Sequence, residues 1–146
     1  MAYNILIVDD STPMRAVIKK IVKASGFNVG QFFEAANGRE ALDILNQEWL
    51  DLVLTDYNMP DMNGLELVEE MNKDDHLKSI PAVMITTEGS RERVEEFMAK
   101  GVIEYIKKPF TPEQIKQQIK QKLKHIMGET EDEEQRYDNG DEELDF

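Results

Sequence analysis

The feature that most constrains the fold is a series of short apolar runs that alternate with helical patterns. Strands are predicted at residues 4–8, 31–35, 51–55, 82–85 and 102–106, and apolar residues recur at helical spacing after each of them. The last three runs are apolar nearly throughout, which is typical of parallel strands covered by helices on both faces. This alternation predicts an α/β fold, namely a doubly wound, five-stranded parallel sheet with five helices.

Capping residues indicate where the helices begin. Thr12 and Pro13 fit an N-cap followed by proline at the first helical position, and Gly26 is placed to end that helix. Asn37 with Glu40 resembles a capping box for a second helix through about residue 46. The remaining three helices are expected to begin near residue 64, after residue 90 and at residue 111.

Charge divides the 146-residue chain into two parts. The net charge is −13, and residues 128–146 contribute −9 of it, from ten acidic residues and one arginine. Apolar residues almost vanish in this segment, so it cannot offset the entropy lost on ordering. We therefore expect one folded domain over residues 1–127, followed by an acidic, disordered tail over residues 128–146.

The composition also excludes several classes of protein. Without cysteine, the chain has no disulfides, thiolate metal sites or thiol nucleophiles. No apolar run approaches the roughly 20 residues of a membrane helix, and no signal sequence is recognisable at the start. The acidic balance argues against nucleic-acid binding, which needs clustered basic residues. We expect a cytoplasmic protein with no membrane or nucleic-acid partner.

Polar residues with chemical potential stand at the ends of the predicted strands. Asp9 and Asp10 follow the first strand, Asp56 follows the third, Thr86 the fourth and Lys108 the fifth. In open parallel sheets, ligands bind at the carboxyl ends of the strands, so these side chains should share one edge. Three acids, a hydroxyl and a lysine together indicate a divalent cation and a phosphoryl group, with Asp56 as the acceptor.

Each member of this set also has an ordinary explanation. Asp9 and Asp10 could simply cap the first helix, Thr86 could bond to nearby backbone, and Lys108 could be a surface lysine. Three crowded carboxylates repel one another without a cation, however, and Mg²⁺ prefers oxygen ligands. The combination therefore favours a magnesium site more than any single residue does.

The motifs together resemble the receiver domain of bacterial response regulators. The resemblance covers about residues 5–126, and it is greatest with the single-domain chemotaxis regulators of that family. It implies the flavodoxin-like strand order 2-1-3-4-5. The motifs that carry it are Asp9-Asp10, the loop Asp56-Tyr57-Asn58-Met59-Pro60 with Gly64, Thr86, and Lys108-Pro109-Phe110.

The resemblance implies a role for each residue at the acidic end of the site. Asp56 would accept a phosphoryl group from a phosphohistidine. Asp10, Asp56 and the backbone carbonyl of Asn58 would bind Mg²⁺ directly, and Asp9 would act mainly through water. Asn58 and Glu88 would flank the path of the water that removes the phosphoryl group, so we expect a short-lived phosphorylated state.

The resemblance also implies a switch. Lys108 would pair with the phosphate or the acids, Thr86 would move to the phosphate, and Tyr105 would swing inward behind it. A doubly charged phosphate creates charge-assisted hydrogen bonds that bias a two-state packing. The Lys108–Pro109 peptide bond is expected to be cis.

The expected partners are a sensor histidine kinase and a target such as a flagellar motor switch protein, with a phosphatase as a further possibility. The chain would be a monomer and no enzyme beyond its own phosphorylation and dephosphorylation. A phosphorelay intermediate remains an alternative. A magnesium-dependent aspartyl phosphohydrolase is less favoured, because Asn58 stands where such enzymes place a general acid. A flavin carrier is disfavoured by carboxylates where a phosphate cradle is needed.

Overall fold

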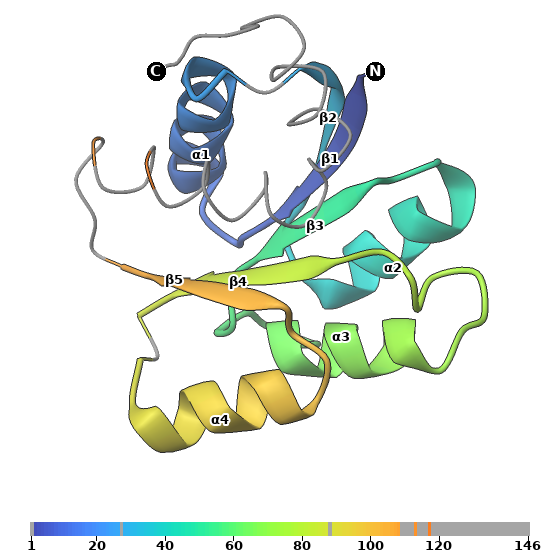
Figure 1. Cartoon of the computed structure of the whole chain (residues 1–146). Coiled ribbons are helices and arrows are strands. Elements are labelled where there is room, and N and C mark those ends of the chain that lie inside the picture. The colour runs from blue at the N-terminus through green and yellow to red at the C-terminus, as the bar shows by residue number, and fades with distance from the viewer. Residues whose placement is uncertain (1, 27, 88, 109–112, 114–116, 118–146) are drawn as a thin grey trace, which may run out of the picture.

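A computed structural model describes residues 2–26, 28–87, 89–108, 113 and 117 (Figure 1). The five strands form one parallel sheet in the order β2-β1-β3-β4-β5, which confirms the predicted topology. The strands are β1 (Tyr3–Val8), β2 (Val29–Ala35), β3 (Leu52–Thr55), β4 (Ala82–Thr86) and β5 (Glu104–Lys107). The helices are α1 (Thr12–Ala24), α2 (Gly38–Gln47), α3 (Gly64–Asn72) and α4 (Arg91–Ala99).

The described part of the chain holds four helices rather than the five expected. Most of the predicted fifth helix, which should begin at residue 111, lies outside the described residues, and the two that are described, Glu113 and Gln117, are helical. The tail over residues 128–146 and Pro109 also lie outside the described residues. Across the residues that are described, no helix has the length and apolar character needed to cross a membrane.

Alternate residues of the central strands pack into two separate hydrophobic cores, one on each face of the sheet. From β1, Leu6 and Val8 pack with residues of α2, α3 and α4, whereas Ile5 and Ile7 pack with α1. Figure 1 shows the same division, with α1 on one face of the sheet and α2, α3 and α4 on the other. Every residue of β3 and β4 is buried, which confirms that both faces of these strands are covered. The core thereby fixes the strand register, because a one-residue slip would exchange the two faces.

The start of α1 corrects one detail of the prediction. Ser11, not Thr12, is the N-cap, and its side chain accepts the backbone N–H of Met14 at 3.2 Å. Thr12 is the first helical residue, and Pro13 lies in the first turn, where a missing N–H costs nothing. A serine one residue earlier is preferred because its oxygen then reaches the N–H of the third helical residue.

The starts of the next two helices follow the sequence closely. Asn37 caps α2 by accepting the N–H of Glu40 at 2.9 Å, as predicted, although the Glu40 carboxylate returns to the N–H of Ala36. In α3 the reciprocal pair is complete, because Asn63 accepts from Glu66 and the Glu66 side chain accepts from the Asn63 N–H. These caps place the first turns of both helices at the carboxyl edge of the sheet.

One exposed ion-pair cluster joins α1 to the edge strand β2. Glu34 accepts from Lys19 Nζ at 2.6 Å and from Arg15 Nε at 2.9 Å. The hydrogen bond from Lys19, followed by that from Arg15, lowers the pKa of Glu34 despite its partial burial. A lowered pKa means that the ionised group stabilises the folded state above its unfolded value of about 4.5 and that this stabilisation is lost as pH falls through the folded value.

We predict that Glu34→Gln lowers the free energy of unfolding at pH 7 by less than about 1 kcal/mol, because the pair is partly solvated. The difference from wild type should shrink as the pH falls below about 4.5. Urea unfolding at several pH values measures it, with Glu48→Gln, at an exposed position, as the control. A difference that did not change with pH would contradict the ion-pair explanation.

Candidate functional site

Chain topology brings the five predicted site residues to one edge of the sheet. Asp9 and Asp10 follow β1, Asp56 follows β3, Thr86 ends β4 and Lys108 follows β5. Backbone hydrogen bonds hold these strand ends in register: Asp56 N donates to Val8 O at 2.8 Å, and Lys108 N donates to Thr86 O at 2.7 Å. The edge therefore places chemistry from four strands side by side, as parallel topology requires.

The three aspartates form a compact acidic cluster. One carboxylate oxygen from each of Asp9, Asp10 and Asp56 lies within 4.8 Å of the others. Asp9 is only 2% exposed, Asp56 is partly buried and Asp10 is exposed, so the cluster opens to solvent on one side. Several carboxylates around one point with an open side form the donor set that suits Mg²⁺, which keeps some of its waters. These residues can hold such a cation.

Lys108 lies between two of the acids. Its Nζ is 3.0 Å from Asp9 Oδ2 and 3.3 Å from Asp56 Oδ2, and its side chain is 13% exposed. Burial alone would lower the pKa of Lys108, but the hydrogen bond to Asp9 and the charges of Asp56 and Asp9 outweigh burial and raise the pKa. Lys108 is therefore a permanent cation that partly neutralises the cluster.

The carboxylate of Asp56 is held at both oxygens. Oδ1 accepts the backbone N–H of Tyr57 at 2.7 Å, and Oδ2 faces Lys108. Burial raises the pKa of Asp56, Lys108 opposes this, and the nearby charge of Asp9 raises the pKa further. Ionised Asp56 is thus an oriented anion in surroundings that disfavour its charge. Binding of a cation, or of a group that spreads the charge, therefore stabilises the site.

The loop after Asp56 depends on glycine at position 64. A Cβ there would lie 2.1 Å from the backbone oxygen of Asp56, closer than atoms can pack. This close approach allows the N–H of Gly64 to donate to Tyr57 O at 2.9 Å. The first residue of α3 therefore fixes the backbone of the acceptor residue and its neighbour.

The other predicted residues occupy more varied positions. Thr86 is fully buried at the end of β4, and Tyr105, on β5, is partly buried against the core under α3 and α4. Asn58 is exposed in the loop after β3. Glu88 lies outside the described residues, so its position at the rim of the site stays a prediction.

The structure answers one question that the sequence left open. Asp9 does not cap α1; its Oδ1 accepts the N–H of Ser11 at 2.9 Å, and its Oδ2 binds Lys108. Sequence reasoning missed Arg15, which donates to the backbone oxygen of Asp9 and so supports the acidic loop from α1. Only its position one helical turn after Ser11 could have suggested this contact.

We predict that Asp56→Asn raises the urea midpoint of the metal-free protein in EDTA. The substitution removes a partly buried charge that lies beside another carboxylate, while Lys108 keeps its bond to Asp9. Asp61→Asn, at an exposed site beyond the cluster, is the matched control and should leave the midpoint near wild type. A lower midpoint for Asp56→Asn would show that the pair with Lys108 outweighs burial and repulsion.

We also predict that Gly64→Ala destabilises the protein by about 1–3 kcal/mol, because the added methyl meets backbone that cannot move aside. Gly30→Ala is the control, since the nearest atom there is the side-chain oxygen of Asn4, which can rotate away. Urea unfolding of both variants measures the difference. Equal stability of the two would contradict the close approach at Asp56.

Comparison with known proteins agrees with this geometry. The family model of the response regulator receiver domain matches residues 5–120. Chemotaxis protein CheY-3 of Vibrio cholerae is 43% identical over 116 residues, which are 80% of this chain and 88% of that protein. Chemotaxis protein CheY1 of Helicobacter pylori is 41% identical over 126 residues, which are 86% of this chain and 97% of that protein.

Solved structures agree as well. The high-resolution structure of the chemotaxis response regulator CheY4 of Vibrio cholerae superimposes with a TM-score of 0.74 at 31% identity, covering 87% of this chain and all of that one. Since the family model spans most of the chain and the relatives are matched over nearly their whole length, the chain belongs to the receiver-domain family of response regulators and is similar to its CheY-type chemotaxis members.

Proposed function

We propose that the protein is a chemotaxis-type response regulator whose Asp56 accepts a phosphoryl group from a sensor histidine kinase in a Mg²⁺-dependent reaction. The observation that carries this proposal is the Asp56 carboxylate itself. It is oriented by Tyr57 N–H, paired with Lys108 and grouped with two further acids at the carboxyl edge of the sheet. Receiver-family membership supports the same assignment.

Mg²⁺ would be held by Asp10, Asp56 and the backbone carbonyl of Asn58, with Asp9 acting through water. The clustered carboxylates of the three aspartates support this donor set. The bound cation would supply positive charge beside the oxygens of the incoming phosphoryl group. Asp9 also keeps Lys108 in place, because it shares Lys108 with Asp56.

In the transfer step, a carboxylate oxygen of Asp56 attacks phosphorus, and the bond between phosphorus and the kinase histidine breaks. The product is an acyl phosphate on Asp56, and the electron pair of the broken bond returns to the histidine nitrogen. Lys108 lies 3.3 Å from Asp56 Oδ2 and is therefore placed to move its hydrogen bond to a phosphoryl oxygen. Its raised pKa keeps it protonated for this role.

Phosphorylation would then act as a switch. Thr86 ends the strand next to Asp56 and would donate its hydroxyl to the phosphate, and Tyr105 would turn inward into the space behind it. In the β4–β5 ladder Tyr105 lies opposite Met84, which is two residues before Thr86. Thr86 and Tyr105 are therefore near neighbours on adjacent strands and can respond together. The new charge-assisted bonds would bias a two-state packing around α4 and β5.

The output would be phosphorylation-dependent binding to a partner such as a flagellar motor switch protein. The similarity to CheY-3 and CheY1, both named chemotaxis proteins, supports this over a phosphorelay intermediate. Receiver-family membership likewise favours a signalling protein over a phosphohydrolase or a flavin carrier. We propose that it works in the cytoplasm as a monomer and is reset by water at a rim formed by Asn58 and Glu88, with or without a phosphatase.

Acetyl phosphate with Mg²⁺ should add one phosphoryl group to the protein. A small phosphoryl donor can replace the kinase because the groups that promote the transfer belong to the receiver domain. Intact mass spectrometry measures the added mass. Asp56→Asn should abolish it and EDTA should suppress it.

Asp61→Asn is the matched control, because Asp61 is an exposed acid five residues after Asp56. Its backbone is in the left-handed region, which asparagine also tolerates. It should be phosphorylated like wild type. Stoichiometric phosphorylation of Asp56→Asn would overturn the assignment of the acceptor.

A further inference from the structure

Tyr57 contacts the acceptor with its backbone and α4 with its ring. Its N–H donates to Asp56 Oδ1 at 2.7 Å, and its carbonyl accepts from Gly64 N–H at 2.9 Å. Its ring lies 5.3 Å from the ring of Phe97, and the guanidinium carbon of Arg93 lies 4.8 Å from the centre of the Tyr57 ring. The residue is thus held at the acceptor by backbone bonds and at α4 by two side chains.

Few side chains secure α4 to the core. Of its nine residues only Phe97 is buried, whereas α3, which also has nine residues, buries five of them. Of its other apolar residues, Met98 is 38% exposed and Val94 is only partly buried. Its contacts with Phe97 and Arg93 make the Tyr57 ring one of the groups that hold this helix.

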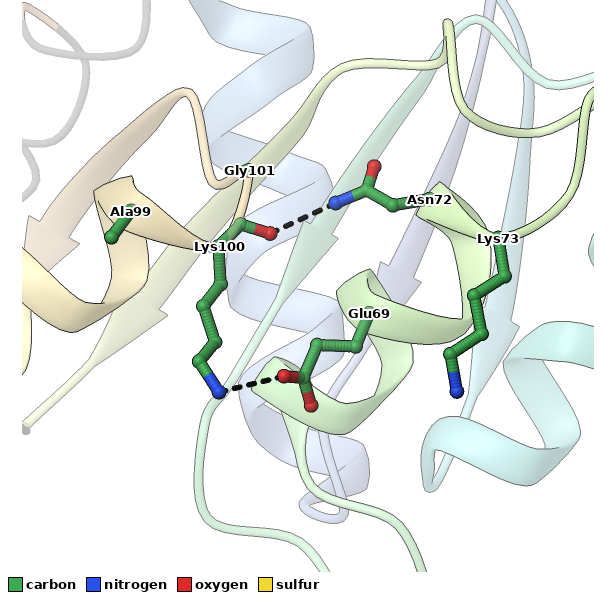
Figure 2. Close-up of a pocket in the computed structure, with 6 residues that line it drawn as sticks. All are labelled: Glu69, Asn72, Lys73, Ala99, Lys100 and Gly101. Carbon is green, nitrogen blue, oxygen red and sulfur yellow. Dashed lines mark hydrogen bonds and ion pairs between the residues drawn. The ribbon is translucent and has the colours of Figure 1, made fainter.

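The C-terminal end of α4 is held separately. Asn72 Nδ2 donates to Lys100 O at 2.8 Å, and Lys100 Nζ pairs with Glu69 Oε2 at 2.8 Å (Figure 2). These contacts border a surface cavity of about 490 Å³ between the ends of α3 and α4. Gly101 follows with φ of 106°, and a Cβ there would meet Asn72 at 2.3 Å, so this junction requires glycine.

We propose that Tyr57 is a positioning residue that couples the chemical state of Asp56 to the tilt of α4, with Arg93 and Phe97 as its contacts on the helix. The C-terminal end of α4 stays fixed at Lys100, and its N-terminal half responds to the Tyr57 ring. This inference rests on the proposed phosphorylation of Asp56. It adds a second connection between the acceptor and α4, distinct from that through Thr86 and Tyr105.

The direction of the effect follows from the state described. Oδ1 of Asp56 accepts from Tyr57 N–H and Oδ2 is bound to Lys108, and we assign this arrangement, with Arg93 over the Tyr57 ring, to the resting state. Removing a contact made in the resting state lowers the free-energy gap to the switched state. A ligand that favours the switched state must then bind more tightly, by linkage.

Beryllium fluoride with Mg²⁺, a stable mimic of the phosphoryl group, tests this on the full chain. Arg93→Gln should bind it roughly two- to fivefold more tightly than wild type, the range that corresponds to one partly exposed cation–π contact. Fluorine NMR titration measures the affinity. The same variant should unfold at lower urea, so tighter binding would accompany lower stability, which a purely structural role does not produce.

Arg91→Gln is the matched control. It removes the same charge from the same helix two residues away, and the Arg91 side chain is 92% exposed. Its affinity should equal that of wild type. Tyr57→Leu should reproduce the effect of Arg93→Gln, Tyr57→Phe should stay near wild type because it keeps the ring, and the double variant Tyr57→Leu/Arg93→Gln should gain little beyond Tyr57→Leu.

Amide hydrogen exchange locates the response. Beryllium fluoride should change exchange in the N-terminal half of α4 in wild type and in Arg91→Gln, and the change should be clearly smaller in Tyr57→Leu. Unchanged or weaker affinity in Arg93→Gln, or an equal gain in Arg91→Gln, would overturn the coupling while leaving Asp56 as acceptor. A wild-type protein without a bound fluorine signal would overturn the proposed function, and the coupling with it.

Discussion

Repulsion among like charges at one edge of the sheet is the constraint on which the site depends. Asp9, Asp10 and Asp56 are brought within 4.8 Å of one another by strands that begin far apart in the sequence. Lys108 offsets part of this charge through contacts of 3.0 and 3.3 Å, and its own burial is tolerated only because the acids are there. Binding of a cation, or of a group that spreads the negative charge of the three aspartates, therefore stabilises the cluster.

The scaffold withstands this repulsion because its central strands are buried on both faces. Two cores, one under α1 and one under α2, α3 and α4, fix the register of β1, β3 and β4. The positions of the strand ends, and of the site residues that follow them, are fixed as a result. Gly64 adds a second restraint by letting α3 start against the backbone of Asp56. By contrast, α4 buries a single residue, the fewest among the four described helices, so a movement of α4 breaks few buried contacts.

The local signals of the chain predicted most of the architecture. The apolar runs predicted all five strands, and the Asn37 cap predicted where α2 begins, because these patterns record local backbone preferences. The start of α4 was also predicted correctly, after residue 90, and the structure shows that Ser90 is its N-cap. The same reasoning chose Thr12 over Ser11, since two adjacent hydroxyl residues give nearly equal signals and only the helix geometry selects one. Helical spacing also does not tell how wide the buried face of a lightly packed helix is, and in α4 Met98 is 38% exposed.

By itself, the sequence determined the parallel sheet, the residues at its carboxyl edge and the chemistry they share, because side-chain type and strand position follow directly from residue order. Tertiary structure alone decided how the acids divide between partners: Asp9 bonds to Ser11 and Lys108, and Asp56 to Tyr57 and Lys108. It alone placed the Tyr57 ring in contact with Arg93 and Phe97. The contacts of Lys108 with the acids, and of Tyr57 with α4, join residues from separate βα units, and their distances depend on how whole elements pack, which no local pattern encodes.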